Sequence, residues 1–480
     1  MTPFQEFRLW LRRAPNNQRV PAAIVTIVVL GLLAWAIIPA STSSSSNASP
    51  TPTPTQVQNV SETPPTPAPA PSKCTNPIGS VPGITAKTIK VGIILVHVTG
   101  LASNGSLGIL PYQTQQTIFS RLVDSMNKNG GIDCRQIVPY YVQANPADQA
   151  TLQQTCLNMV QAGVFGVIDA GAFAQFSVVD CFGQHHTPYF GGYLLPNSQM
   201  QKFYPYLFEL NSLDTVYHDT VGGLAQRGWF TAAKGFSKLG LMYHDCYPEI
   251  HTEFMAWLAQ AGVKPSQVEQ VDVGCPSAFA SPTALEEAIL KFKQDHVTNV
   301  IPLNMVGDLS TFTKLAAAQN FHPIYGFPDD SLIAISYGTQ APDYGNIANS
   351  LAITASRDAE DTTPALSAAP TPGTVACSGI IGVNVYRLAA AAGNACDELW
   401  MFKAAVDHAS TLTQQSLSQG LQAAKAVVFS FPQGPNDFSA GSRITYAGQY
   451  WRVAQFLKSC KAYQGGCWQV IDPAFKPSVQ

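Results

Sequence analysis

The segment that decides the fold is Thr88-Ile89-Lys90-Val91-Gly92-Ile93-Ile94-Leu95-Val96, an almost unbroken run of apolar and β-branched residues. Such runs are typical of strands in a parallel sheet, because helices bury both faces of the sheet. The chain then places four apolar residues at helical spacing, Phe119, Leu122, Val123 and Met126. An Asn-Gly-Gly sequence at 129–131 is expected to end this helix. The segment therefore predicts the first β-α unit of an α/β fold.

The alternation of strand and helix continues along the chain. Further strands are expected at 136–143, 164–171, 188–193, 238–244, 268–274, 299–304 and 323–327. Two successive sets of this kind predict two similar lobes, each a parallel sheet with helices on both faces. A helical region is expected from Val385 to Ala424. The stretches 429–431, 443–457 and 467–472 are expected to form antiparallel or edge strands.

Composition excludes some classes of protein. The 480 residues include 27 Lys and Arg against 30 Asp and Glu, so the basic excess of a nucleic-acid-binding protein is missing. Aromatic residues make up 10% of the chain, enough to contribute to a hydrophobic core. A wholly disordered chain is therefore excluded, because disordered chains have too few such residues.

The N-terminal region is typical of export. Residues 1–21 form a basic segment that is expected to stay in the cytoplasm. The run 22–40 carries no charge, and its part Ala22–Ile38 would span about 25 Å as a helix, enough to cross a hydrocarbon core. We interpret it as an uncleaved membrane anchor, with a cleaved signal peptide as the alternative. Residues 41–72, rich in Ser, Thr and Pro, are expected to form a disordered linker.

The order of sequence motifs resembles one known family. Residues 83–92 match the opening G-[VI]-T-x-x-x-I-K-[VI]-G of the type I periplasmic binding proteins, which include the branched-chain amino-acid receptors of ABC transporters. Residues 127–132 with Arg135 match the turn N-x-x-G-G-I-x-G-[RK], with Cys134 in place of the usual Gly. The segment 437–448 is weakly similar to the last interlobe connection of the family. The resemblance covers residues 83–475.

The resemblance implies a two-lobed fold that closes on a small solute. Three interlobe crossovers are expected, near Asn211, Ile353 and Ser439. The binding-protein domain would then cover 73–480, with lobe 1 formed by 83–211 and 354–438 and lobe 2 by 212–353 and 440–475. The implied function is an extracytoplasmic solute-binding protein that works with an ABC permease and needs no cofactor. A ligand sensor without a transport role and a hydrolase on an α/β scaffold are the alternatives.

Ten cysteines in an exported chain predict a disulfide framework. The absence of a C-x-x-C pair argues against a metal site. Sequence does not fix the connectivity, but the expected order of strands and helices favours five pairs: Cys74–Cys134, Cys156–Cys181, Cys246–Cys275, Cys377–Cys396 and Cys460–Cys467.

Ligands of open parallel sheets lie beyond the carboxyl ends of the strands. The candidate ligand-binding residues in these loops are His97, Thr99, Gly171, Ala172, Phe173, Tyr193, Tyr243, Asn304 and Asp329. The resemblance implies that Asp329 binds the ammonium group of a ligand. For Phe173 and Tyr243 ordinary packing is the alternative, and Asp308 is expected to be a helix N-cap.

One departure from the family bears on the ligand. Amino-acid receptors of the family hold the ligand carboxylate with Ser or Thr hydroxyls after the third strand, where this chain has Gly171-Ala172-Phe173-Ala174. The candidate loops also contain no Lys or Arg. We therefore hypothesise a neutral or amine-bearing ligand that is partly apolar. The chain contains no G-x-S-x-G, P-loop or H-E-x-x-H motif, so no enzymatic activity and no metal site are expected.

Overall fold

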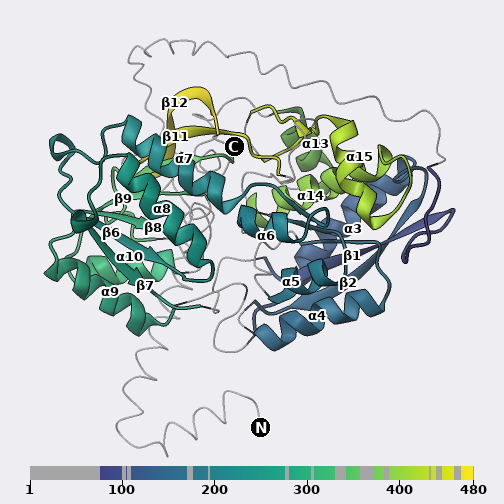
Figure 1. Cartoon of the computed structure of the whole chain (residues 1–480), viewed down its shortest axis with the longest axis horizontal. Helices are drawn as coiled ribbons and strands as arrows, with labels where there is room; N and C mark the ends of the chain where they lie inside the picture. Colours follow the sequence, from purple (N-terminus) through teal and green to yellow (C-terminus); the bar gives the residue numbers. More distant parts are fainter. Residues whose placement is uncertain are drawn as a thin grey trace, which may run out of the picture. The chain divides into compact units, whose positions relative to one another are not determined.

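The structure is a computed structural model that describes most of the chain from residue 76 onward (Figure 1). The described ranges are 76–99, 104, 110–146, 148–169, 177–192, 195–275, 280–303, 308–329, 342–356, 371–382, 389–431, 434–438, 446–458 and 466–478. The expected anchor at 22–40 and the linker at 41–72 lie outside these ranges. Among the described helices, none is both long and apolar enough to cross a bilayer.

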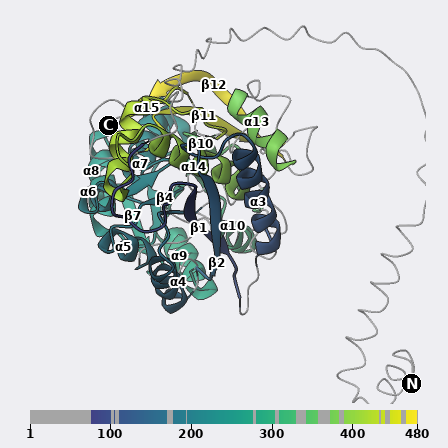
Figure 2. The ribbon, with the colours of Figure 1, turned by 90° about the vertical axis from the view of Figure 1, so that its right-hand side faces the viewer.

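The first lobe contains a five-stranded sheet whose paired strands are all parallel, in the order β2-β1-β3-β4-β5. Its strands are β1 (Thr88–Val96), β2 (Gln136–Ala144), β3 (Gly166–Ile168), β4 (Tyr189–Gly191) and β5 (Leu207–Glu209). The connecting helices are α3 (Tyr112–Lys128), α4 (Gln149–Gln161), α5 (Ser177–Gln184) and α6 (Asn197–Lys202). Helix α3 and helices α4 and α5 belong to different hydrophobic cores, on opposite faces of the sheet (Figure 2).

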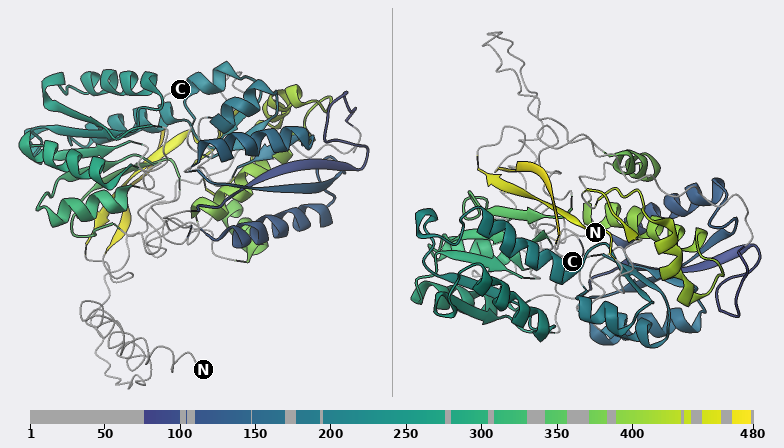
Figure 3. Two further views of the ribbon diagram at one scale, coloured as in Figure 1. Left: turned by 90° about the horizontal axis from the view of Figure 1, so that it is seen from below. Right: turned by 45° about the horizontal axis from the view of Figure 1, so that its top comes forward.

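The second lobe contains a seven-stranded mixed sheet in the order β12-β11-β10-β9-β8-β6-β7. Its strands are β6 (Leu239–Tyr243), β7 (Val268–Asp272), β8 (Asn299–Pro302), β9 (Ile324–Phe327), β10 (Leu351–Thr354), β11 (Tyr450–Leu457) and β12 (Cys467–Pro477). Strands β6 to β10 are parallel to one another, whereas β11 is antiparallel to both β10 and β12. The antiparallel pair, drawn in yellow, forms one edge of this sheet (Figure 3).

Four helices cover the two faces of the second sheet. They are α7 (Leu213–Gln226) and α8 (Pro248–Gln260) on one face, and α9 (Pro282–Gln294) and α10 (Leu309–Ala318) on the other. Helix α9 begins as the sequence indicates, because the Ser281 side chain accepts a hydrogen bond from the Ala284 N–H and Pro282 occupies the first turn. Short 3₁₀ turns lie at Ala232–Lys234, Pro265–Gln267 and Gln414–Ser416.

The chain then returns to the first lobe through α13 (Pro372–Ile381), α14 (Ala389–Asp407) and α15 (Leu417–Ala424). All three contribute to the core that contains α3 and one face of β1. The helical region expected from 385 to 424 contains two helices, α14 and α15. The chain leaves the helical path after α14 because the Leu412 N–H donates to the Pro77 carbonyl, and Leu412 forms a bridge with Ile78.

The expected strand at 429–431 was also wrong. The backbone N–H groups of Ser430 and Phe431 donate to the carboxyl of Asp397, at 2.6 and 2.8 Å, instead of to a neighbouring strand. Strands β5 and β10 and helices α7 and α13 were not anticipated. The two strands contain only three and four residues.

The turn that carries the N-x-x-G-G-I motif has a clear steric basis. Gly131 has φ +77°, and a Cβ there would collide with the carbonyl oxygen of Arg135. Cys134, which replaces the usual Gly, also has a positive φ of 57°. A left-handed backbone favours Gly, so this Cys keeps the conformation that the motif requires. Cys134 is bonded in a disulfide, but its expected partner Cys74 lies outside the described residues.

Three of the five expected disulfides are present: Cys156–Cys181, Cys246–Cys275 and Cys377–Cys396. The first joins α4 to α5, the second joins the loops after β6 and β7, and the third joins α13 to α14. The pair Cys460–Cys467 includes a residue outside the described ranges. Each described bridge therefore connects elements of one lobe.

Three passages connect the two lobes. Residue Leu210 still belongs to the first core and Leu213 to a second-lobe core, so the first passage includes Asn211. The second follows β10, which ends at Thr354. The third lies later than the expected Ser439, because Ala447 packs in the first core and Trp451 in the second lobe. It runs beside the first passage, where the Gly448 N–H donates to the Leu210 carbonyl.

Two neighbouring glycines of α7 provide a test of how closely this helix packs on the sheet. A Cβ on Gly223 would lie 2.5 Å from Cδ1 of Ile353 and 3.0 Å from the Trp451 ring, whereas one on Gly222 would meet nothing within 4 Å. We expect Gly223→Ala to lower the free energy of unfolding by about 1–3 kcal/mol through overpacking. Gly222→Ala should instead raise it by about 0.5–1 kcal/mol. Urea denaturation of both variants measures the difference, and equal effects would contradict the described packing.

Candidate functional site

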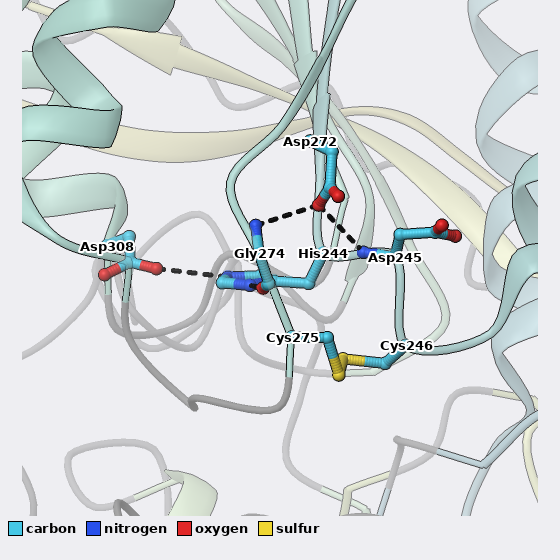
Figure 4. Close-up of a disulfide and its surroundings, with 7 residues drawn as sticks. All are labelled: His244, Asp245, Cys246, Asp272, Gly274, Cys275 and Asp308. Atoms are coloured by element: carbon cyan, nitrogen blue, oxygen red, sulfur yellow. Dashed lines mark hydrogen bonds and ion pairs between the residues drawn. A yellow bond between two sulfur atoms is a disulfide. The ribbon is translucent and has the colours of Figure 1, made fainter.

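The carboxyl end of the second sheet is held by a buried histidine (Figure 4). His244 follows β6, and its Nδ1 lies 2.5 Å from the Gly274 carbonyl oxygen, while its Nε2 lies 3.2 Å from the Asp308 carboxyl. A carbonyl oxygen only accepts hydrogen bonds, so Nδ1 must donate, and the carboxyl oxygen at Nε2 favours a second donated proton. Burial alone would lower the pKa of His244, but Asp308 and the Gly274 carbonyl raise it overall.

Asp308 has a different task from the expected one. It occupies the N-cap position of α10, but its side chain makes no capping hydrogen bond there. Its Oδ2 instead accepts the Ala280 N–H at 2.8 Å and faces His244. Asp308 therefore joins the start of α10 to the segment that follows β7. Among the described residues, no group of three His, Cys, Asp or Glu side chains is arranged to hold a metal ion.

A disulfide also joins the loops that His244 connects by its hydrogen bond to Gly274. The disulfide Cys246–Cys275 joins the residues that follow β6 and β7, and Asp272 at the end of β7 hydrogen-bonds within the same two loops (Figure 4). Its Oδ1 accepts the N–H groups of Asp245 and Gly274 at 3.2 and 2.8 Å. A covalent bond, a carboxyl and the His244 ring thus fix two neighbouring loops at the edge where ligands of parallel sheets lie.

Tyr243, a candidate ligand-binding residue, stacks on His251 with ring centroids 4.2 Å apart. The Nε2 of His251 lies 2.5 Å from Oε1 of Gln270. Both partners come from the second lobe, from α8 and β7. The structure thus gives Tyr243 the packing role that was its alternative, and leaves its role toward a ligand a prediction.

Asp329, the expected partner of a ligand ammonium group, is almost fully buried at 2% exposure after β9. Its Oδ1 accepts hydrogen bonds from the Ser356 backbone N–H and hydroxyl, at 3.3 and 2.9 Å. Burial raises the pKa of Asp329 to about 6, although hydrogen bonds from Thr354 and Ser356 act in the opposite direction. In this structure Asp329 joins the ends of β9 and β10.

In the first lobe, the candidates His97 and Thr99 lie together where β1 ends. The His97 Nδ1 lies 2.7 Å from Oε1 of Gln143, and its ring centroid is 4.6 Å from that of Tyr112. The Thr99 hydroxyl accepts a hydrogen bond from the Asn145 amide at 3.1 Å. The end of β1 is thereby tied to the end of β2. The other candidates, Gly171, Ala172, Phe173, Tyr193 and Asn304, lie outside the described residues.

Sequence reasoning missed a set of buried acids at the carboxyl end of the first sheet. Asp169 follows β3, Glu209 ends β5, and Glu398 lies on α14; none of the three is more than 1% exposed. The Tyr189 hydroxyl donates to Oδ2 of Asp169 at 2.7 Å. A Cβ built on Gly191 would lie 2.5 Å from Oε1 of Glu209 and 3.0 Å from the Tyr189 hydroxyl, so these groups are neighbours.

Burial and neighbouring carboxyls raise the pKa values of two groups in this set, Glu398 and Tyr189. Burial, followed by the carboxyls of Asp169, Glu209 and Asp397, raises the pKa of Glu398 well above its ordinary value. Burial and the carboxyls of Asp169 and Glu209 likewise raise the pKa of Tyr189. The sequence signal was present but weak: single acids end the apolar segments 164–169 and 207–209, and Glu398 interrupts an apolar helix.

The model of the family described as periplasmic binding protein matches residues 119–461. Because this is more than half of the chain, the protein belongs to that family. Membership places the folded region outside the cytoplasm, in agreement with its disulfides. No curated protein matches the chain in sequence.

Solved structures agree on the type I periplasmic-binding fold. The fatty acid ABC transporter substrate-binding protein from Thermomonospora curvata has a TM-score of 0.56 at 14% identity, covering 83% of this chain and 95% of its own. A solute-binding protein of an ABC transporter from Rhodopseudomonas palustris, in complex with 3,4-dihydroxybenzoic acid, has a TM-score of 0.55 at 14% identity, covering 82% and 98%. The type 1 periplasmic binding protein from Bordetella pertussis has a TM-score of 0.56 at 13% identity, covering 82% and 100%.

The raised pKa of Asp329 predicts a pH dependence of stability. Between its ordinary 3.8 and about 6 the folded protein keeps a proton that the unfolded chain has lost, so this group's contribution falls as the pH rises through that window. The stability of wild type relative to Asp329→Asn should therefore fall by about 3 kcal/mol from below to above the window. Denaturation at several pH values measures this.

Asp148→Asn provides a control with the opposite sign. Asp148 is the N-cap of α4, and hydrogen bonds from Thr151 and Ala150 hold its pKa below the ordinary value. Its contribution is present above that ordinary value and is lost as the pH falls through the folded pKa. Two curves with the same sign would contradict the assignment.

Proposed function

We propose that the protein captures a small solute between its two lobes outside the cytoplasm and delivers it to an ABC importer. The family match over residues 119–461 carries this proposal. The arrangement of the fold supports it, because polar and aromatic side chains gather at the carboxyl ends of both sheets, where open α/β sheets bind ligands. With the third crossover between Ala447 and Trp451, the proposed lobes are 83–211 with 354–447, and 212–353 with 451–475.

The proposed mechanism is closure without covalent chemistry. The loops after β6 and β7 are fixed by Cys246–Cys275 and by His244, so they would meet the solute as a preformed surface. The crossovers would supply the hinge, since a few connecting residues can absorb the rotation between lobes. The free energy of solute contact with both lobes would then favour the closed state.

The proposed ligand is neutral or amine-bearing and partly apolar. One similar structure is a complex with 3,4-dihydroxybenzoic acid, and another is named as a fatty acid binding protein, so apolar or aromatic groups suit this fold. A carboxylate ligand suits this chain less well. The candidate loops carry no Lys or Arg, and the carboxyl end of the first sheet holds Asp169, Glu209 and Glu398.

We further propose that residues 22–40 anchor the protein in the membrane and that 41–72 form a stalk. The uncharged run and the basic segment before it support an N-terminus in the cytoplasm. N-terminal sequencing of the protein from membranes tests the anchor. A mature N-terminus beyond residue 40 would instead identify a cleaved signal.

Two other functions remain to be tested against transport. A ligand sensor would have the same fold, and solute uptake by a deletion strain distinguishes it, because loss of a sensor would leave uptake intact. A hydrolase would turn over its ligand. Incubation of the bound solute with stoichiometric protein, followed by recovery of unchanged solute, would exclude this activity.

Solute binding predicts a thermal response of the full-length protein. A ligand at a hundred times its Kd should stabilise the folded state by about 2.7 kcal/mol. A thermal-shift screen with amines, alcohols, amino acids and carboxylates measures this. The same screen at pH 7 should show no shift with inorganic phosphate or succinate, and tight binding of either would contradict the proposed ligand class.

A further inference from the structure

A short helix of the first lobe reaches the second lobe beside the first crossover. Helix α6 connects β4 to β5, and its Met200 is buried in the first-lobe core that contains α4 and α5. The Asn197 N–H at the start of α6 donates to Oδ2 of Asp214 at 2.7 Å. Asp214 lies in the first turn of α7, a helix of the second lobe. The crossovers are therefore not the sole connection between the lobes at this point.

The next residue of α6 contacts a different helix of the second lobe. The Ser198 hydroxyl donates to Oε1 of Glu249 at 2.7 Å. Glu249 lies in the first turn of α8, which follows the loop after β6. This loop lies at the carboxyl end of the second sheet, the edge where open α/β sheets bind ligands. The hydrogen bond therefore connects the first lobe to the candidate ligand-binding edge of the second.

The electrostatic environment of Tyr247 is a third observation that brings the lobes together at the start of α8. Tyr247 precedes α8 and packs against the second-lobe core. Burial, followed by the carboxyls of Asp180, Glu209 and Glu249, raises the pKa of Tyr247 well above its ordinary value. Asp180 lies on α5 and Glu209 ends β5, so two of these three carboxyls belong to the first lobe.

These interlobe contacts are of a kind that can form and break. Ser198 is exposed, and Asn197, Asp214 and Glu249 are half-buried, so water can replace both hydrogen bonds when the helices separate. One such hydrogen bond changes an equilibrium by roughly twofold to tenfold. Two of them are enough to favour one arrangement of the lobes without making it permanent.

We propose that α6 is a latch, in which Asn197 and Ser198 bind Asp214 and Glu249 and hold the lobes of the free protein in the described arrangement. The latch separates when the lobes open. The inference rests on the proposed function and deepens it, because opening is the step that admits and releases a solute. The latch sets how often the free protein opens, and this population scales the apparent affinity for a solute.

Hydrogen-exchange mass spectrometry of the free full-length protein tests the latch without a solute. Ser198→Ala removes the donor on α6, and Glu249→Gln weakens the acceptor on α8. We expect Ser198→Ala to speed amide exchange roughly threefold in 247–254, and Glu249→Gln to do the same in 195–202. Each effect lies in the lobe that does not carry the substitution, because separation of the latch exposes both sides.

Two control variants make the same chemical changes away from the latch. Thr252→Ala removes a hydroxyl that donates to the Pro248 carbonyl within α8. Glu286→Gln neutralises an exposed acid on α9. Neither should change amide exchange in 195–202, and an unchanged Tm in all four variants shows that the fold is retained.

The double variant Ser198→Ala/Glu249→Gln distinguishes one shared contact from two local effects. Its exchange should be no faster than that of the more affected single variant, because both substitutions act on the same bond. Effects confined to the substituted lobe, or effects that multiply in the double variant, would overturn the latch. Such a result would leave the proposed function standing, since that function is tested by solute binding in the thermal-shift screen. A confirmed latch without any bound solute would count against the proposed function alone.

Discussion

The structure of the first lobe depends on the interior position of β1 in its sheet. This strand pairs with β2 on one side and β3 on the other, and its residues Val91 to Val96 are buried without interruption. Its two faces feed different cores, with Ile93 and Leu95 in one and Ile94 in the other. A strand that is paired along both edges and packed on both faces fixes the register of its neighbours. The hydrogen bond between His97 and Gln143 then holds the loop that leaves its end.

The buried acids at the carboxyl ends of the two sheets differ in the groups that surround them. In the second lobe, each acid has a donor nearby: Asp308 has His244, Asp272 has backbone N–H groups, and Asp329 has Ser356. In the first lobe, acids are gathered beside other acids, and the strongest described donor is the Tyr189 hydroxyl. The two edges thus differ in the described surroundings of their acids.

The sequence was sufficient for the fold and insufficient for this asymmetry. Long apolar strands and helices with a clear period, such as 88–96 and α3, were located closely, and spacing along the chain gave three disulfides correctly. The short strands β5 and β10 were missed. Acids such as Glu398 and Asp308 escaped for a physical reason. Asp308, for example, interacts with His244, 64 positions away, and a one-dimensional pattern carries no information about such pairs.

The three described disulfides have a mechanical consequence. Cys156–Cys181 and Cys377–Cys396 cross-link helices of the first lobe, and Cys246–Cys275 cross-links loops of the second. Each bond stiffens a body that moves as a unit, and none of the three spans the joint. Disulfide formation outside the cytoplasm would thus stabilise each lobe without restricting rotation at the crossovers. Stability against unfolding would come from disulfides within the lobes, whereas rotation would take place at the crossover segments. The two properties, which often oppose each other in one domain, would then depend on different parts of the chain.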